Sequence, residues 1–403
     1  MGEALRNAPA EVAVIARPER EILLCCARRE MDGAHARRLR AALAAGPDPA
    51  RLLAMAERHR MIPLLHRHFA AAEGALPAEA AADLRARFAE GARRSLALAG
   101  ELHRVLGMLA AAGIGAAAYK GPALAAVAYG DLAMRTLSDL DVLVAPADVP
   151  RAMEVLAAHG FAAEHEWTPR QERAFRRVDG DYPLWSARGD VLVEVHAHVS
   201  SLRFGVRLGT AELLARARPV RVGGAEVPAP APDDLLLALA LHGAKHRWAR
   251  LEWIAAFAEV ARAHPDAVRS ALARARALRG LRVLCLGMAL ARDLLGLPVS
   301  AEVDEAISAD PALAGMAAEV QAVLFRSGDG PEETAANLAF NLRLREGAAQ
   351  RALYAWRWLT LPTPEDWNAV KLPDALHPLY RIVRPVRLLA RYAPSLVSGR
   401  RAP

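Results

Sequence analysis

The chain has 403 residues, 54% of them hydrophobic, and carries a formal net charge of +7 at pH 7. This length suffices for two or three domains, and the apolar content predicts a sizeable core and excludes a disordered chain. The basic excess comes almost entirely from arginine. It suits an anionic ligand, whether a nucleoside triphosphate, a nucleic acid or an acidic membrane surface, and does not choose among them.

Residues 11–95 predict a small bundle of helices, because apolar residues recur at helical spacing between prolines. A long helix from about Arg87 to Ala112 leads out of this bundle and ends at a glycine. Residues 114–119 then predict the first strand. Pro122 opens a helix that ends at about Tyr129, since proline suits the first helical turn. The apolar run 140–144 predicts a second, buried strand.

Residues 148–159 predict another helix, and 161–166 a short third strand. The polar, arginine-rich stretch 167–183 predicts a loop or a short helix. Residues 190–198 alternate between apolar and polar side chains, which predicts a half-buried strand. Its polar face carries Glu194, His196 and His198.

From residue 233 onward the periodicity is helical again, with apolar stripes through 235–263, 266–295 and 311–325. Residues 326–337 predict a loop. The basic tail from Tyr380 to Arg401 could be an amphipathic helix at a membrane surface or on RNA. Because Pro385 interrupts it, we favour a packed helix with a solvated arginine face. These elements predict three regions: an N-terminal helical region (1–95), a core (96–227) and a C-terminal helical region (228–403).

The three cysteines, Cys25, Cys26 and Cys285, form no Cys-x-x-Cys pair, which excludes a zinc ribbon. They are too few for a disulfide framework, so we expect core residues in a reducing compartment. No apolar run approaches the ~18 residues of a membrane span, and the charged N-terminus does not match a signal peptide. We therefore expect a cytoplasmic protein.

Two aspartates, Asp139 and Asp141, stand two residues apart where the second strand begins, so their side chains share one side. The two aspartates could simply form a turn before the strand. However, two carboxylates that repel each other at one place favour a site for a divalent cation, which takes oxygen ligands. Glu194 offers a third carboxylate from another strand. Because the two aspartates repel each other, we expect the removal of either to leave the fold intact.

The ordered set Lys120-Gly121, Tyr129, Arg135, Asp139, Asp141, Glu194 and His196 resembles the polymerase-beta-like nucleotidyltransferase superfamily. Within it, the chain is most similar to a family of uncharacterised bacterial nucleotidyltransferases, over roughly residues 100–260. The resemblance implies an α+β, mostly helical fold, in which a small mixed-sheet nucleotidyltransferase core is flanked by helical regions.

The same resemblance implies two Mg²⁺ (or Mn²⁺) ions held by Asp139, Asp141 and Glu194, which would also be the catalytic residues. His196 would support a metal-bound carboxylate. The residues expected to bind NTP, such as ATP, are Lys120, Gly121, Arg135, His242, Lys245 and His246. The chain departs from the family pattern at Pro122, where serine or glycine is usual, at Glu194, where aspartate is usual, and at Ala256, where aspartate is frequent.

We therefore expect an enzyme that moves a nucleoside monophosphate from NTP to an unknown acceptor, which could be a small molecule, a protein or an RNA. The alternative is a protein that binds nucleotide or acceptor on the same fold without catalysis, which Pro122 favours. A third class, an RNA-binding protein, is disfavoured by the 5% aromatic content. Zinc at His196 and His198 lacks a complete ligand set, and a metalloprotease motif is excluded because Gly243 follows His242.

Overall fold

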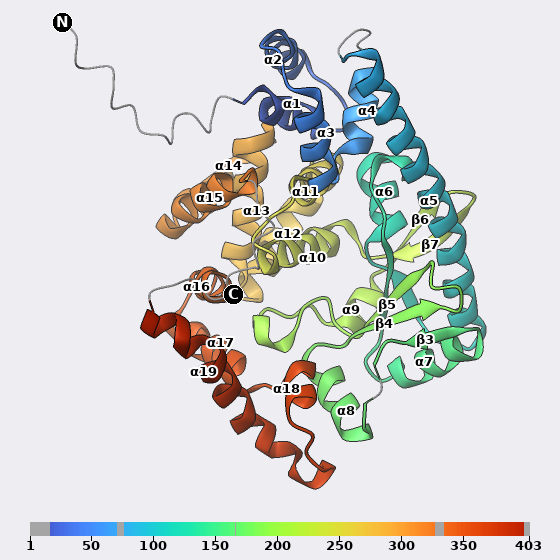
Figure 1. Ribbon diagram of the computed structural model, residues 1–403, viewed down its shortest axis with the longest axis vertical. Helices are drawn as coiled ribbons and strands as arrows, with labels where there is room; N and C mark the ends of the chain where they lie inside the picture. The colour runs from blue at the N-terminus through green and yellow to red at the C-terminus, as the bar shows by residue number, and fades with distance from the viewer. Residues whose placement is uncertain (1–16, 71–75, 166, 327–333, 399–403) are drawn as a thin grey trace, which may run out of the picture.

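The computed structural model describes residues 17–70, 76–165, 167–326 and 334–398. Four short helices form the N-terminal bundle at one end of the molecule (Figure 1). They are α1 (Pro18–Cys26), α2 (Gly33–Ala44), α3 (Pro49–Arg58) and α4 (Ile62–Ala70). They lead into α5 (Ala78–Ala111), a helix of 34 residues that begins earlier than its predicted start at Arg87. Since α5 runs unbroken across residue 95, the bundle and the core share this helix.

A five-stranded mixed sheet forms the core, in the order β1-β2-β5-β4-β3. The strands are β1 (Ala116–Ala118), β2 (Asp139–Val144), β3 (Phe161–Ala163), β4 (Asp181–Ser186) and β5 (Leu192–His196). Strands β2 and β5 are parallel, and the other neighbours are antiparallel. Apolar residues of the sheet pack with those of α5 and α7 (Val149–Ala158) into one buried cluster.

The polar stretch predicted as a loop or short helix contains both a helix and a strand. Helix α8 (Pro169–Val178) occupies its first part, and β4 begins at Asp181. A two-stranded hairpin of β6 (Arg218–Val222) and β7 (Ala225–Ala229) was not predicted, because prolines in both strands weaken the strand pattern. The short helix α9 (Thr210–Ala215) precedes this hairpin.

Helices make up the rest of the described chain. Beside the sheet lie α6 (Gly121–Tyr129) and the 3-10 turn η2 (Leu132–Met134). After β7 come α10 (Pro232–Lys245), α11 (Leu251–Ala263), α12 (Pro265–Ala277), α13 (Leu281–Leu295), α14 (Ala301–Ser308), α15 (Pro311–Leu324), α16 (Thr334–Arg343), α17 (Ala348–Thr360), α18 (Pro364–Ala369) and α19 (Tyr380–Ser398). Two further 3-10 turns are η3 (Leu202–Phe204) and η4 (Asp374–Leu379). The prediction of an α+β, mostly helical fold is confirmed.

The helical region packs around the fully buried Trp248. A Cβ atom at Gly243 would lie 2.5 Å from the Trp248 ring, and one at Gly287 would lie 3.0 Å from it. Both glycines are therefore explained by close packing. No described helix has the length and apolar character needed to cross a membrane.

The C-terminal tail differs from its prediction in two ways. Pro385 does not interrupt it, because α19 continues from Tyr380 to Ser398. Its arginine face is not simply solvated, since Arg384 is buried. The tail residues Arg400 and Arg401 lie outside the described residues, as do residues 1–16 and the loop segment 327–333.

Candidate active site

A cavity of about 1120 Å³ lies where the sheet, α10, the α3–α4 turn and the C-terminal helices meet. All ten residues that were expected to bind metal or nucleotide, or to support the metal site, line it. These are Lys120, Gly121, Arg135, Asp139, Asp141, Glu194, His196, His242, Lys245 and His246. Residues spread over more than a hundred positions are thus brought to one space, which is large enough for a ligand of nucleotide size.

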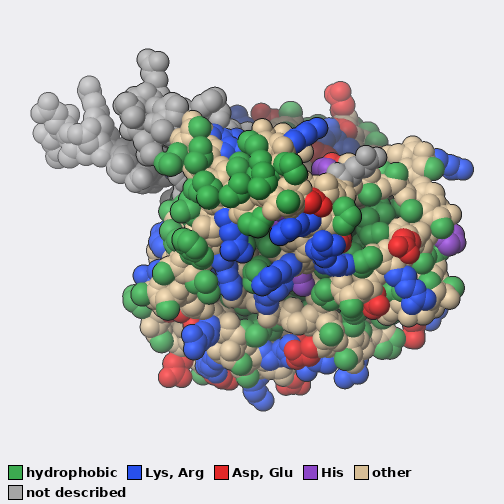
Figure 2. Space-filling view, turned by 90° about the horizontal axis from the view of Figure 1, so that it is seen from below, with side chains coloured by type: hydrophobic (Ala, Val, Ile, Leu, Met, Phe, Trp, Pro, Cys, Tyr) green, Lys and Arg blue, Asp and Glu red, His purple; other side chains and the backbone are tan. Residues whose placement is uncertain are grey.

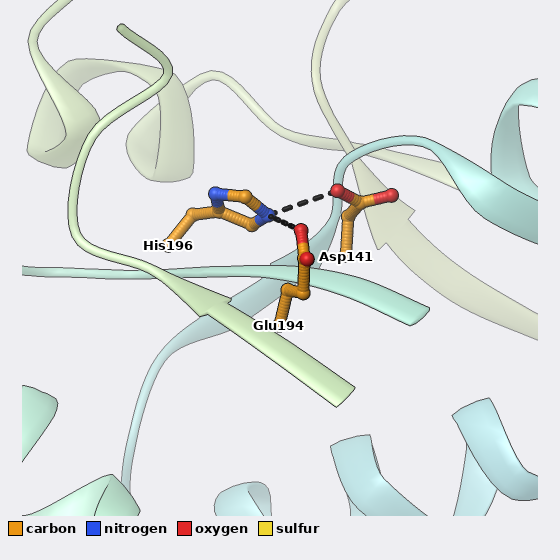
Figure 3. Close-up of side chains that lie close together, drawn as sticks. All are labelled: Asp141, Glu194 and His196. Carbon is orange, nitrogen blue, oxygen red and sulfur yellow. Dashed lines mark hydrogen bonds and ion pairs between the residues drawn. The ribbon is translucent and has the colours of Figure 1, made fainter. Parts of the chain in front are cut away.

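A compact group in this cavity has the side chains to hold a metal ion. Ligand atoms of Asp141, Glu194 and His196 lie within 4.8 Å of one another (Figure 3). His196 Nε2 is 2.9 Å from Asp141 Oδ1 and 3.4 Å from Glu194 Oε2. Two carboxylates and an imidazole form a donor set that suits a divalent cation such as Mg²⁺ or Mn²⁺.

Strand register explains this grouping. In the parallel pair β2–β5, Asp141 stands opposite Glu194, while Asp139 stands opposite Leu192. His196 follows Glu194 by two residues and therefore shares its side of the sheet. Among the described residues, the group that could bind a metal includes His196 and not Asp139. The predicted role of Asp139 as a ligand stays a prediction.

Lys120 forms a buried ion pair with Asp141, with Nζ 2.7 Å from Oδ1. Burial alone would raise the pKa of Asp141, but the Lys120 ammonium and the His196 hydrogen bond hold that pKa far below its usual range. In the same way, burial would lower the pKa of Lys120, and the Asp141 charge raises it instead. Both groups are therefore charged at neutral pH.

Gly121 sets the backbone path that carries Lys120 to this place. Its φ of +52° lies in the left-handed region, and a Cβ atom there would come within 3.3 Å of the Asp139 carbonyl oxygen. Glycine alone meets both conditions without strain. The turn then continues into α6 with Pro122 in its first turn.

Arg135 is paired with Glu252, and both side chains are buried. Its Nη2 lies 2.7 Å from Glu252 Oε1, and its Nη1 donates to the Gly121 carbonyl oxygen at 3.5 Å. The sequence analysis assigned no role to Glu252. The pair links the turn before β2 to the start of α11, so it joins the core to the helical wall of the cavity.

Asp181 is a site residue that the sequence did not reveal. It stands opposite His196 in the β4–β5 register, and His196 Nδ1 lies 3.0 Å from its Oδ1. Burial by itself would lower the pKa of His196, but Asp181 and Asp141 raise it well above its usual range. The imidazolium donates to both carboxylates, so binding a cation through Nε2 requires the loss of its proton. The sequence pattern that could have predicted the strand carrying Asp181 is the alternation of Tyr182 and Leu184 with less buried positions.

The helical wall places three basic side chains on the cavity. His242 packs against His246 and Trp253, with ring centroids 4.9 and 5.1 Å away. Burial, aided by the Lys120 charge, lowers the pKa of His242 well below its usual range, so this imidazole is neutral. Lys245 Nζ lies 4.0 Å from Asp181 Oδ2.

Arg60 is a second residue that sequence reasoning missed. It lies in the turn between α3 and α4 and lines the cavity, where its charge opposes the rise in the pKa of Asp139 that burial causes. Its φ is 54°, a left-handed conformation that is uncommon for arginine. This conformation ends α3, with the Met61 N–H donating to the Ala56 carbonyl oxygen at 2.7 Å. No sequence motif marks this position.

A family model described as an uncharacterised nucleotidyltransferase matches residues 45–296 of the chain. No curated protein matches the chain. The matched segment includes Arg60, Asp181 and all ten cavity residues that were singled out from the sequence.

Proposed function

The chain belongs to the uncharacterised nucleotidyltransferase family, and on this basis we propose that it moves a nucleoside monophosphate from an NTP to an acceptor hydroxyl. The acceptor oxygen would bond to the α-phosphorus, the bond from that phosphorus to the β-phosphate oxygen would break, and pyrophosphate would leave. The observation that carries this proposal is the Asp141–Glu194–His196 group inside a cavity with several cationic side chains.

The donor set fits Mg²⁺ or Mn²⁺, with Asp141 and Glu194 as oxygen ligands and His196 as a nitrogen ligand or as a partner of the carboxylates. A cation there would offset the negative charge that develops on the phosphates. Imidazole ligation favours Mn²⁺ over Mg²⁺. Asp139 adds a further carboxylate on the same side of β2.

Cationic side chains around this group would hold the triphosphate. The Lys120 ammonium has three N–H donors, so it can keep Asp141 and also bind a phosphate oxygen. Lys245 and Arg60 bring positive charge from α10 and from the α3–α4 turn. We assign the proton of the acceptor hydroxyl to Glu194, whose side chain is 31% exposed and is the most open of the group.

The second candidate is a binding protein that has kept the nucleotide site and lost catalysis. Pro122 favours it, because proline in the first turn of α6 removes a backbone N–H that could bind phosphate. The two candidates share the cavity and differ only in turnover.

The test combines calorimetric titration of ATP, GTP, CTP and UTP in the presence of Mg²⁺ or Mn²⁺ with a pyrophosphate-release assay. Cell extract and α-phosphate-labelled NTP would reveal the acceptor class as a labelled small molecule, protein or RNA. Asp141→Asn should abolish labelling, while Asp266→Asn, an exposed control on α12, should leave it unchanged. Nucleotide binding without transfer to any acceptor would support the second candidate, and the absence of binding by every nucleotide would defeat both.

A further inference from the structure

Exposed apolar side chains gather on the C-terminal helices. Of the eleven large hydrophobic residues that are exposed in the described chain, nine lie between positions 353 and 389. We call these nine residues the C-terminal apolar face: Leu353, Trp356, Leu359, Val370, Leu376, Leu379, Ile382, Val386 and Leu389. A concentration of this kind marks an interaction surface, whereas singly scattered apolar residues are ordinary.

Helix α19 turns two of its arginines inward, beside the buried Tyr380 and Leu388, and a row of apolar side chains outward. Ile382, Val386 and Leu389 recur at helical spacing on one side and are 62%, 59% and 65% exposed. On the other side, Arg384 Nη1 lies 3.1 Å and Arg387 Nε 2.5 Å from the fully buried carboxylate of Asp366. The helix is thus held by its arginines, and its apolar side is left for an external partner.

Basic residues surround this face. The sequences of α17 and α19 contain no Asp or Glu. Basic side chains outnumber acidic ones among the exposed charged residues of α17, α19, the connection between these helices and the adjoining α8. The basic ones are Arg173, Arg177, Arg351, Lys371, Arg381 and Arg391, and the acidic ones are Glu365 and Asp374. Figure 2, viewed from the end where these helices lie in Figure 1, shows hydrophobic side chains gathered in one area with Lys and Arg side chains beside it.

Apolar exposure and positive charge together select one kind of partner. A second copy of the chain would bring arginine-rich helices against each other, which like-charge repulsion opposes. RNA would require cationic side chains across the face, but the exposed residues of the face itself are apolar and the arginines lie at its border, while Arg384 and Arg387 are bound to Asp366. An anionic bilayer surface accepts apolar side chains at the acyl boundary and attracts the basic border, and Trp356 is a side chain typical of that interface.

We propose that α17 and α19 dock this protein on the surface of an anionic phospholipid membrane, without crossing it. The docked face adjoins the cavity, because α17 carries Leu353 and Trp356 on this face while its Tyr354 and Trp358 line the cavity. Docking therefore brings the active cavity to the membrane surface. This proposal is independent of whether the cavity catalyses transfer.

The experiment is vesicle flotation with the full chain, using phosphatidylcholine alone and an equal mixture of phosphatidylcholine and phosphatidylglycerol. We expect binding to the anionic vesicles, weakened by salt, and little binding to the neutral ones. The triple variant Ile382→Gln/Val386→Gln/Leu389→Gln should weaken binding by at least about tenfold, since three exposed apolar contacts are removed. Leu96→Gln changes an equally exposed leucine on α5 and should bind like the wild type.

Circular dichroism would establish that the triple variant is folded, and Trp356→Ser provides a second, independent removal of apolar contact. Equal binding to neutral and anionic vesicles, unchanged binding by both variants, or no vesicle binding at all would overturn the proposal. A concentration-dependent dimer that the triple variant abolishes, without vesicle binding, would assign the face to a second copy instead.

Discussion

Lys120 and Asp141 are charge partners in the absence of any ligand, with Nζ and Oδ1 2.7 Å apart and the Asp141 side chain 2% exposed. Asp139, two residues earlier on β2, has the opposite electrostatic situation. Burial and the Asp141 charge raise the pKa of Asp139, while Lys120 and His196 hold the pKa of Asp141 low. Two aspartates that look equivalent in the sequence therefore differ in what they contribute to stability.

Asp141→Asn should destabilise the protein by about 3 kcal/mol, because it leaves the half-buried Lys120 without its ion-pair carboxylate and removes one of the carboxylates that surround the buried His196. Asp139→Asn should be neutral or stabilising by up to about 0.5 kcal/mol, because it removes a charge that burial disfavours. Urea unfolding monitored by circular dichroism measures both. For Asp141, the ion pair with Lys120 thus changes the expectation, drawn from mutual repulsion, that the removal of either aspartate leaves the fold intact. Equal effects of the two variants would contradict the assignment of Lys120 to Asp141.

Asp181→Asn should weaken Mn²⁺ binding by about 10- to 100-fold, since Asp181 orients the His196 ring through Nδ1. Calorimetric titration with Mn²⁺ and the loss of the free-Mn²⁺ electron paramagnetic resonance signal both report this without requiring activity. Asp190→Asn, on the exposed β4–β5 turn, is the matched control. If Asp181→Asn retains the wild-type affinity, His196 does not take part in metal binding.

Gly121→Ala should cost about 1–2 kcal/mol and disturb nucleotide binding, because alanine at a φ of +52° is strained and its Cβ would press on the Asp139 carbonyl oxygen. Gly91→Ala, in the middle of α5 with no atom within 4 Å of the new Cβ, should instead stabilise by about 0.5–1 kcal/mol. Thermal unfolding of the two variants gives opposite shifts if the left-handed turn is present, and shifts of the same sign would refute it.

His59 makes stability depend on pH. Burial, with the nearby charges of Arg58 and Arg250, lowers the pKa of its imidazole to about 3. In the unfolded chain the His59 imidazole has its ordinary pKa of ~6.5 and takes up a proton below that pH, whereas in the folded chain it stays neutral. The free energy of unfolding is therefore at its full value above pH ~6.5 and falls by about 1.4 kcal/mol per pH unit below it. His59 Nδ1 accepts the Leu251 N–H, a bond that the Asn amide oxygen can replace.

Between pH 7 and pH 5 the wild type should therefore lose about 2 kcal/mol more than His59→Asn. Urea unfolding at the two pH values measures the difference, and comparing the two proteins removes the contribution of the other histidines. Parallel losses in the two proteins would show that His59 is not the titrating group.

Much of the fold follows from local patterns. The helical stretches 235–263, 266–295 and 311–325 were predicted because apolar residues recur at the helical period, and the first two each contain two helices, α10 with α11 and α12 with α13. Pro122 in the first turn and Gly130 at the end bound α6 as proline and glycine do elsewhere. The division into three regions stays a prediction. The short strands were harder, since β1 and β3 have only 3 residues each, which is too few for periodicity to be measured.

By itself, the sequence determined that the protein is α+β and mostly helical, and it identified ten residues that line one cavity. The period of a strand indicates that Asp139 shares a side with Asp141, and Glu194 with His196. The resemblance to the nucleotidyltransferase family supplied the rest of the set. Only the tertiary structure decided the partners of Lys120 and Arg135, the role of Asp181 and the outward apolar side of α19. These depend on charges and surfaces that meet from distant segments, and a side chain's pKa, exposure and strain are set by what packs against it.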